Sequence, residues 1–458
     1  MNKSSIRKLL SENYSLLSIL IGIVLISVTI GPFQNRDTEW EYEAALGVIK
    51  WGVPYVITFG NIMDQSPLGF YIEALFFKVF GLSLDTGVAL VTLFGLGCTV
   101  MVYKIGKVLY GKTTGLLAVV LFASTQWQLI ISRSFLIDVQ CLFFSLLSLF
   151  VGISAVRKDS LKLFLVSGTL FAAALMTKLF AVFTLIPLML LYVYYRPKKL
   201  RRTPIMLGAF FLPALLFAFL WYQVISGQGL LSVFHHSDFN HFNASGVVPS
   251  YFFVANFLLY YGLGWFFTAA VVLSLLVCFL RRKLFSKILV FDIVCLATII
   301  SVISVNIFLG AGLNLKSPYN NAIKYSYQSL PFFSLLAASL PGKCLSMCHS
   351  ATRKKLNKLY FSVALVGLFL LASAIFVNMV FANFISRWDY LLFRVEMDKD
   401  LGYSLFNPTP MDKYDSLMGI QYLGFALVLS GLVWASRHKI GRLLRLIPHL
   451  HLLPNEPQ

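Results

Sequence analysis

Long apolar segments separated by short polar ones run along almost the whole chain. Each is close to the roughly 20 residues that a helix needs to cross a bilayer. The segments lie at 15–33, 84–103, 114–132, 138–156, 161–177, 179–195, 204–226, 251–280, 288–309, 325–341, 359–384 and 417–436. This pattern predicts an all-α, polytopic transmembrane protein of about 12 spans, in a single domain over residues 1–458.

One further apolar stretch, residues 67–81, breaks the pattern because it is short and carries Glu73 and Lys78. If it crossed the membrane, every later loop would change sides. We expect it to lie flat on the outer surface, as one of the amphipathic helices of the first outer loop at residues 34–83.

The charges set the orientation of the spans. Charged residues make up 12% of the chain, against about 25% in a soluble protein, and the net charge is +19. With 67–81 on the outer surface, 27 of the 38 Lys and Arg residues fall on one side, which the positive-inside rule makes the inner side. We therefore expect a plasma-membrane protein with both termini, including the tail 437–458, in the cytoplasm. The cations then anchor loops against membrane lipids, and nucleic acid is not a predicted partner.

Acidic residues are few elsewhere but crowd the start of the first outer loop. Asp37, Glu39, Glu41 and Glu43 lie within seven residues of one another, and Asp64 follows. Acids beside a membrane are typical of proton chemistry or ligand binding. A loop helix with one solvated face would produce the same cluster, so the residue types alone leave both readings open.

Arg133, Asp138 and Lys178 reach the same membrane face in this topology. Asp138 begins the span 138–156, and Lys178 lies in the turn before the span 179–195. A carboxylate there could orient a sugar or accept a proton, and the cations could hold a phosphate as it leaves. The simpler alternatives are an interfacial Asp138 paired with Arg133, and a Lys178 side chain that extends to the interface.

Several motifs occur in an order that resembles one enzyme family. They are Asp37 followed by the GVPY of 52–55, the DQSPLGFY of 64–71, the SRSFLID of 132–138, the ALMTK that ends at Lys178, and the KYSYQSLP of 324–331. Together they look like the GT-C membrane glycosyltransferases of the protein O-mannosyltransferase and aminoarabinose-transferase type, which are glycosyltransferase family 39-like. The resemblance covers most of residues 30–340.

This resemblance implies an inverting cell-envelope glycosyltransferase that acts at the outer membrane face. Its substrate would be a sugar on a polyprenyl-phosphate carrier, and its acceptor a hydroxyl of a lipid, a glycan or a protein, as in protein glycosylation. The family's base maps to Asp37, and its second catalytic acid maps to Asp138. Thr38 stands where the family often has a second acid beside the first, so Glu39 is an alternative base.

The resemblance also implies binding residues. Arg133, Lys178 and Lys324 are expected to contact the donor phosphate. Substrate contacts are expected from Tyr55, Asp64, Tyr325 and Tyr327. The last two tyrosines would also suit an interfacial aromatic belt. No cofactor is predicted with certainty, and a divalent metal is not indicated, since the histidines of the outer loop 227–250 fit no standard zinc spacing.

Two other function classes fit a chain with so many spans. A secondary transporter or lipid flippase predicts internal repeats and broken polar helices near the bilayer midplane. A lipid-binding subunit without catalysis would not depend on Asp37. The candidate residues here gather at one membrane face and no repeat is evident, so the sequence favours the transferase.

Overall fold

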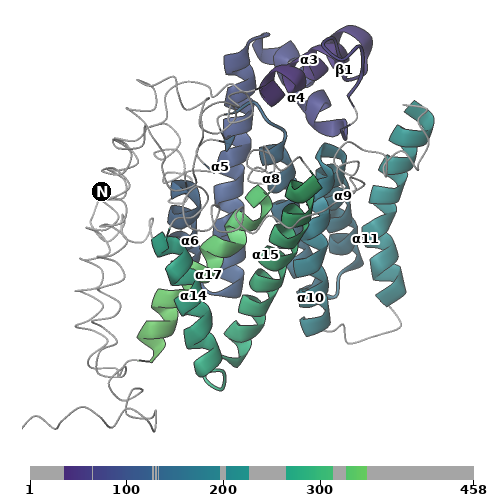
Figure 1. The fold of residues 1–458 in the computed structure, drawn as a ribbon. Coiled ribbons are helices and arrows are strands. Elements are labelled where there is room, and N and C mark those ends of the chain that lie inside the picture. Colours follow the sequence, from purple (N-terminus) through teal and green to yellow (C-terminus); the bar gives the residue numbers. More distant parts are fainter. Residues whose placement is uncertain are drawn as a thin grey trace, which may run out of the picture.

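The computed structural model describes residues 36–63, 65–125, 128, 131–132, 134–195, 203–225, 265–312 and 326–347. The predicted spans 15–33, 359–384 and 417–436 lie outside these residues, and so does the predicted C-terminal tail. Figure 1 shows a bundle of long helices, with two shorter helices, α3 and α4, packed together at one end. We call this the α3–α4 end. The opposite end, where the turn 281–285 joins α14 to α15, is the far end.

A compact unit of two helices and a hairpin forms the α3–α4 end. Its elements are α3 (Arg36–Trp51), β1 (Tyr55–Val56), β2 (Asn61–Ile62) and α4 (Leu68–Phe80). The two strands pair antiparallel, and the Tyr71 hydroxyl of α4 donates a hydrogen bond to the Gly52 carbonyl after α3 at 2.6 Å. Buried Ala44, Phe70 and Ile137 contact one another beneath the unit and attach it to the bundle.

The bundle itself is built from helices that run from one end to the other. They are α5 (Leu84–Leu109), α6 (Lys112–Ser124), α8 (Asp138–Lys158), α9 (Leu161–Thr177), η1 (Leu179–Thr184) with α10 (Leu185–Tyr195), α11 (Thr203–Ala218) with the π-helical turn η3 (Phe219–Ile225), α14 (Trp265–Leu280), α15 (Ser286–Gly312), and η7 (Ser326–Ser329) with α17 (Leu330–Ser346). Their inward faces form one large apolar core.

Four of the described helices are long and apolar enough to cross a membrane. They are Leu84–Leu109, Asp138–Lys158, Thr203–Ile225 and Ser286–Val305. Large apolar side chains remain exposed on their outer faces, including Leu93, Leu215 and Ile300, which is the surface that a lipid environment requires. The prediction of an all-helical, multi-pass membrane protein is therefore confirmed, whereas the count of 12 spans stays a prediction.

Small residues let neighbouring helices approach closely where α5 and α6 cross. A Cβ atom on Gly106 of α5 would lie 2.8 Å from the Cα atom of Gly115 of α6, too close for any real side chain. Without an apolar contrast between helix and lipid, such close backbone contact is a main source of helix association. Tyr110 and Gly111 link the end of α5 to the start of α6 at Lys112, and this connection lies at the far end.

The helix predicted at 114–132 ends earlier than the sequence pattern suggests. α6 stops at Ser124, because Thr125 is extended (φ −64°, ψ 133°) and its hydroxyl donates back to the Phe122 carbonyl at 2.8 Å. Beyond it, the described residues Gln128, Ser132 and Ser134 are all buried. Buried polar side chains at membrane depth are tolerated where protein surrounds them, so these three residues lie inside the bundle.

Candidate active site

A buried ion pair lies at the α3–α4 end of the bundle. The Lys178 ammonium donates to Oδ2 of Asp138 at 2.8 Å, and the two side chains are 1% and 6% exposed. Two opposite charges taken out of water together are costly to desolvate and are retained mainly where they serve structure or function. The structure thus brings two of the predicted site residues into direct contact.

Asp138 and Lys178 lie at helix boundaries that are at the same level along the bundle axis. Asp138 is the first residue of α8, where the positive end of the helix dipole favours a carboxylate. Lys178 separates α9 from η1 in an extended conformation (φ −159°, ψ 139°). The alternative in which Lys178 extends to the interface does not fit, because its side chain is buried against α8.

Glu41 of α3 caps the helix that carries Asp138. Its Oε2 accepts a hydrogen bond from the Ile137 backbone N–H at 2.8 Å, and the side chain is buried. Ile137 has no side-chain acceptor of its own for the start of α8, so a carboxylate from another helix satisfies this donor. The acid-rich α3 is therefore tied directly to the residue before Asp138.

A second buried carboxylate follows in α4. Glu73 is fully buried, and its Oε1 accepts a hydrogen bond from Nε2 of Gln140 at 2.8 Å, while its Oε2 has no hydrogen-bond partner within the described part of the chain. Burial raises the pKa of the Glu73 carboxyl well above its usual range, and the charge of Glu41 raises it further. Gln140 is two residues after Asp138, so α4 and α8 share a polar contact beneath the site.

The close approach of α4 depends on the glycine of the Pro-Leu-Gly sequence. A Cβ atom at Gly69 would lie 2.6 Å from Cγ2 of Ile137 and 3.3 Å from Cγ2 of Thr177. These neighbours directly precede Asp138 and Lys178 in the chain. The small residue therefore lets α4 pack against the start of α8 and the end of α9, which carry the ion pair.

Polar side chains of η7 make buried contacts near the Lys178 turn. The Tyr327 hydroxyl donates to Oε1 of Gln128 at 2.5 Å, and both residues are buried. Nε2 of Gln328 lies 3.4 Å from the Cys141 sulfur, which donates in turn to the backbone carbonyl of Lys178 at 3.6 Å. The predicted substrate residue Tyr327 thus lies in the polar layer around the Lys178 turn.

The remaining acids of α3 have different environments. Glu39 is exposed, and Glu43 accepts hydrogen bonds from the backbone and hydroxyl of Thr58 at 2.9 and 2.8 Å. Glu43 is thus a structural clamp on the hairpin turn. Tyr55, predicted to bind substrate, lies in β1 with its ring 5.0 Å from that of Trp51.

For the other predicted site residues the structure describes no side chain. Asp37 is in the first turn of α3, but only its backbone is described. Arg133, Asp64, Lys324 and Tyr325 fall outside the described residues. Among the described residues, no group of three or more His, Cys, Asp and Glu side chains is arranged to hold a metal ion.

Sequence reasoning missed three buried polar residues of this site: Glu41, Glu73 and Gln140. Glu41 was visible as one of four acids in α3, but no signal distinguished it from its neighbours. Glu73 carried a clear signal, since an acid inside an apolar helix is expensive unless it has a partner. Gln140, two residues after Asp138, was read as part of an ordinary span.

The comparisons with known proteins point to one fold. Residues 64–222 match the model of a family described as dolichyl-phosphate-mannose-protein mannosyltransferase. A comparison with curated proteins gives no match. The crystal structure of ArnT from Cupriavidus metallidurans bound to undecaprenyl phosphate superposes with a TM-score of 0.53 and 14% identity, covering 97% of this chain and 81% of ArnT. The apo form of the same protein gives 0.52 and 13%, with coverage of 97% and 80%.

These matches confirm the resemblance to GT-C glycosyltransferases that the sequence motifs predicted. The family model covers residues from Asp64 to Tyr222, which include Asp138, Lys178 and the glycine of Pro-Leu-Gly. The structural match extends over nearly the whole chain and shows the GT-C type of fold. The residues of the site are not tested by either match, and their roles belong to the proposal that follows.

Proposed function

We propose that this chain, which shares the GT-C fold and the mannosyltransferase family match, is a glycosyltransferase that uses a polyprenyl-phosphate sugar donor. The observation that carries the proposal is the buried Asp138–Lys178 pair, held at the α3–α4 end within the residues that match the family. ArnT, the solved protein with the same fold, is described bound to undecaprenyl phosphate. A lipid-linked phosphate is accordingly the donor class that we assign to this chain.

In the proposed reaction an acceptor hydroxyl attacks the anomeric carbon of the donor sugar. The new bond forms between the acceptor oxygen and the anomeric carbon, and the bond from that carbon to the phosphate oxygen breaks with inversion. The acceptor proton passes to a carboxylate base, and the electron pair leaves on the polyprenyl phosphate. The transition state has oxocarbenium character, as in glycoside hydrolysis, with the acceptor in place of water.

We assign the base to Asp37, with Glu39 as the alternative, and the orientation of sugar or acceptor to Asp138. The charge of Lys178 is balanced by Asp138 at 2.8 Å, so Lys178 fixes the direction of that carboxylate. Arg133 then becomes the stronger assignment for the departing phosphate, because a guanidinium can hold two phosphate oxygens at once.

The remaining assignments follow the motif order. Lys324 is proposed as a second phosphate contact. Tyr55, Asp64, Tyr325 and Tyr327 are proposed to line the sugar and acceptor. For Tyr327 the support is its buried hydrogen bond with Gln128 beside the Lys178 turn, which fixes the ring in place.

We further propose that the α3–α4 end faces outward and the far end faces the cytoplasm. The support is the gathering of described cations at the far end: Lys107, Lys112, Lys158, Lys162, Arg281, Arg282, Lys283 and Lys287. A cysteine at exposed Lys112 should react only with an inner reagent, and one at exposed Asn61 only with an outer reagent. The opposite labelling would move the site to the inner face.

The function is tested with purified protein and a panel of polyprenyl-phosphate sugars, offered with lipid, glycan and peptide acceptors. Release of free polyprenyl phosphate together with a glycosylated acceptor is the expected result for one donor in the panel. Asp138→Asn should abolish it. Ser148→Ala, the matched control, removes the buried contacts of the Ser148 hydroxyl with the carbonyl and hydroxyl of Ser167, between the same helices α8 and α9, and should keep turnover. Transfer of intact donor across vesicles without release would identify a flippase instead.

A further inference from the structure

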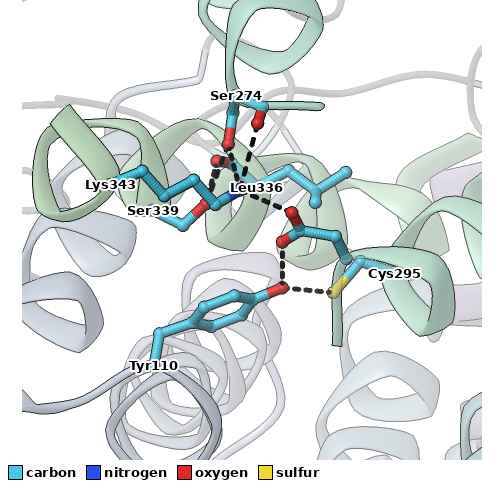
Figure 2. A network of polar contacts seen from close by, with 7 residues as sticks. Tyr110, Ser274, Cys295, Leu336, Ser339 and Lys343 are labelled. Atoms are coloured by element: carbon cyan, nitrogen blue, oxygen red, sulfur yellow. Dashed lines mark hydrogen bonds and ion pairs between the residues drawn. The ribbon is translucent and has the colours of Figure 1, made fainter. Parts of the chain in front are cut away.

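A second buried ion pair lies at the far end of the bundle, away from the proposed active site. Nζ of Lys343 in α17 donates to Oδ2 of Asp292 in α15 at 2.5 Å and to Oγ of Ser274 in α14 at 2.7 Å. Tyr110 donates to the other Asp292 oxygen at 3.0 Å. Figure 2 shows Lys343 beside Ser274 and Ser339, and the Tyr110 hydroxyl beside Cys295 on the other side of the carboxylate that Lys343 contacts. This network joins four helices near their far ends.

All three ammonium hydrogens of Lys343 are engaged within this network. Its third acceptor is the Ser274 carbonyl at 3.2 Å, and the Ser274 and Ser339 hydroxyls lie 2.9 Å apart. The side chains of Lys343 and Asp292 are 1% and 0% exposed. Their opposite charges therefore neutralise each other in a site that water does not reach. The network is therefore neutral overall, and it offers no unpaired charge to a ligand.

A cavity of about 290 Å³ lies beside this network. Hydroxyl-bearing residues and Lys343 contribute to its lining, and so do apolar residues in and next to the α14–α15 turn. Its lining comprises Tyr110, Thr114, Ser339, Lys343, Leu284 and Ile288, with Phe285, Gly342 and Ser346 completing it. The volume is that of a small polar headgroup and is too small for a long prenyl chain.

The α14–α15 turn, which lends Leu284 and Phe285 to the cavity lining, also carries four cations. Arg281, Arg282, Lys283 and Lys287 lie within seven residues, all but the half-buried Arg281 are exposed, and no acid occurs between Arg281 and Phe291. Since Asp292 is neutralised by Lys343, the positive charge of the turn next to the cavity is not balanced by an acid of the turn itself. Such a patch attracts phosphate groups at a membrane surface.

An apolar surface continues from the cavity along α14. Leu276, Phe279, Leu280 and Leu284 are 49%, 62%, 62% and 60% exposed. These side chains extend from the turn toward the middle of the bundle, along the path that acyl chains follow in a bilayer. A soluble anion would leave this apolar surface uncovered, whereas the acyl chains of a lipid would cover it.

We propose that this far-end cavity binds an anionic glycerophospholipid of the surrounding bilayer. The phosphate lies among Arg281, Arg282 and Lys283, the headgroup hydroxyls face Ser339 and Thr114, and the acyl chains lie along α14. This site is independent of the transfer reaction, because it lies at the opposite end of the bundle from Asp138. A soluble phosphate ester carries the same anionic group as this lipid, and the experiment below distinguishes the two ligands.

The probes are phosphatidylglycerol, phosphatidylcholine with the same acyl chains, glycerol phosphate, and polyprenyl phosphate. Retained lipid is counted by native mass spectrometry of the detergent-purified full chain, and the melting temperature is measured with each probe. We expect retention and a raised melting temperature with phosphatidylglycerol alone. Equal protection by glycerol phosphate would mean that a soluble anion is the ligand, and equal protection by phosphatidylcholine would remove the anionic preference. Equal or stronger retention of polyprenyl phosphate would assign the cavity to the carrier.

Two pairs of variants make the test specific. The triple variant Arg281→Ala/Arg282→Ala/Lys283→Ala should weaken phosphatidylglycerol binding about a hundredfold, since each cation near a membrane surface contributes about 1 kcal/mol. Its control is Lys158→Ala/Lys162→Ala, cations of another loop at the same end, which should change binding less than twofold. An equal loss in the control would reduce the effect to general surface charge and overturn the site.

The second pair fills the cavity. A Cβ atom at Gly342 would meet only Thr114 Oγ1, at an ordinary 3.8 Å, so Gly342→Ala should keep lipid binding. Gly342→Phe places a ring in the cavity and should displace the headgroup without loss of the fold. If Gly342→Phe does not fold, Gly342→Leu takes its place. Unchanged phosphatidylglycerol retention in a folded, filled variant would overturn the proposal.

Discussion

Replacing Lys178 by Met tests what the buried Asp138–Lys178 pair is for. Met keeps the length and volume of the side chain but removes its charge. Because the Asp138 side chain is only 6% exposed, the variant leaves a buried carboxylate without its counter-ion. Breaking one side of such a pair typically costs about 3–5 kcal/mol. We expect a clearly lowered melting temperature and a loss of turnover together.

Asp138→Asn is the reverse perturbation, since it leaves the Lys178 ammonium buried without a counter-ion. It should destabilise the protein by a similar amount. The double variant Asp138→Asn/Lys178→Met removes both charges and leaves two neutral side chains at the same separation. Its stability loss should therefore be well below the sum of the two single losses, with a coupling of about 1–3 kcal/mol.

The assay measures melting temperature and turnover for the wild type, both single variants and the double variant in one detergent. If the pair takes part in transfer, stability returns in the double variant but turnover stays down by about 10²–10³-fold, as for the loss of a charged contact to the transition state. Ser148→Ala, which loses the contacts of one hydroxyl with Ser167 at about 1 kcal/mol per hydrogen bond, controls for general loosening of α8 against α9. A double variant that regains both stability and turnover would show that the pair is structural only.

Three further predictions concern the surroundings of the pair. Since burial raises the pKa of Glu73, the folded state holds its proton more tightly than the unfolded chain does, so stability should fall as pH rises from the usual Glu range through that raised pKa; melting curves of Glu73→Gln should lack this slope. Gly69→Ala should displace α4 and cost about 1–3 kcal/mol, whereas Gly208→Ala, where a Cβ meets nothing within 4 Å, should not lower the melting temperature. Asp37→Asn should reduce turnover about 10²–10⁴-fold with donor binding kept, and the same loss in Glu39→Gln alone would reassign the base.

Much of the helical fold could be predicted because the apolar segments have sharp polar ends. The span predicted at 161–177 matches α9 residue for residue, and those at 138–156 and 179–195 match α8 and η1 with α10 closely. α6 is the exception: its apolar pattern continues past Thr125, but the backbone turns extended there because the surrounding protein can satisfy it. Hydropathy records where a segment is apolar, and it carries no information on which protein groups surround it.

The site could be predicted only in part, for a related reason. Asp138 and Lys178 stood out because charges inside apolar segments are expensive and need a purpose. The sequence offered Arg133 as the simplest partner of Asp138, five residues away, but the structure pairs Asp138 with a lysine 40 residues later. Such pairing is set by the packing of α8 against α9, which no local spacing contains. Glu73 and Gln140 were missed for the same reason, since they come into contact only when α4 packs against α8.

The position of Glu41 bears directly on the choice of base. In a helix, residues four apart lie on one face, and residues two apart lie on nearly opposite faces. Glu41 lies on the face of α3 that contacts the start of α8, where its carboxylate binds the Ile137 N–H. Position 37, four residues earlier in the same helix, shares that face, whereas Glu39 is exposed on the other. Of the two candidate bases, position 37 therefore falls on the side of α3 that faces α8 and Glu39 does not, which favours Asp37 in the proposed role of accepting the acceptor proton.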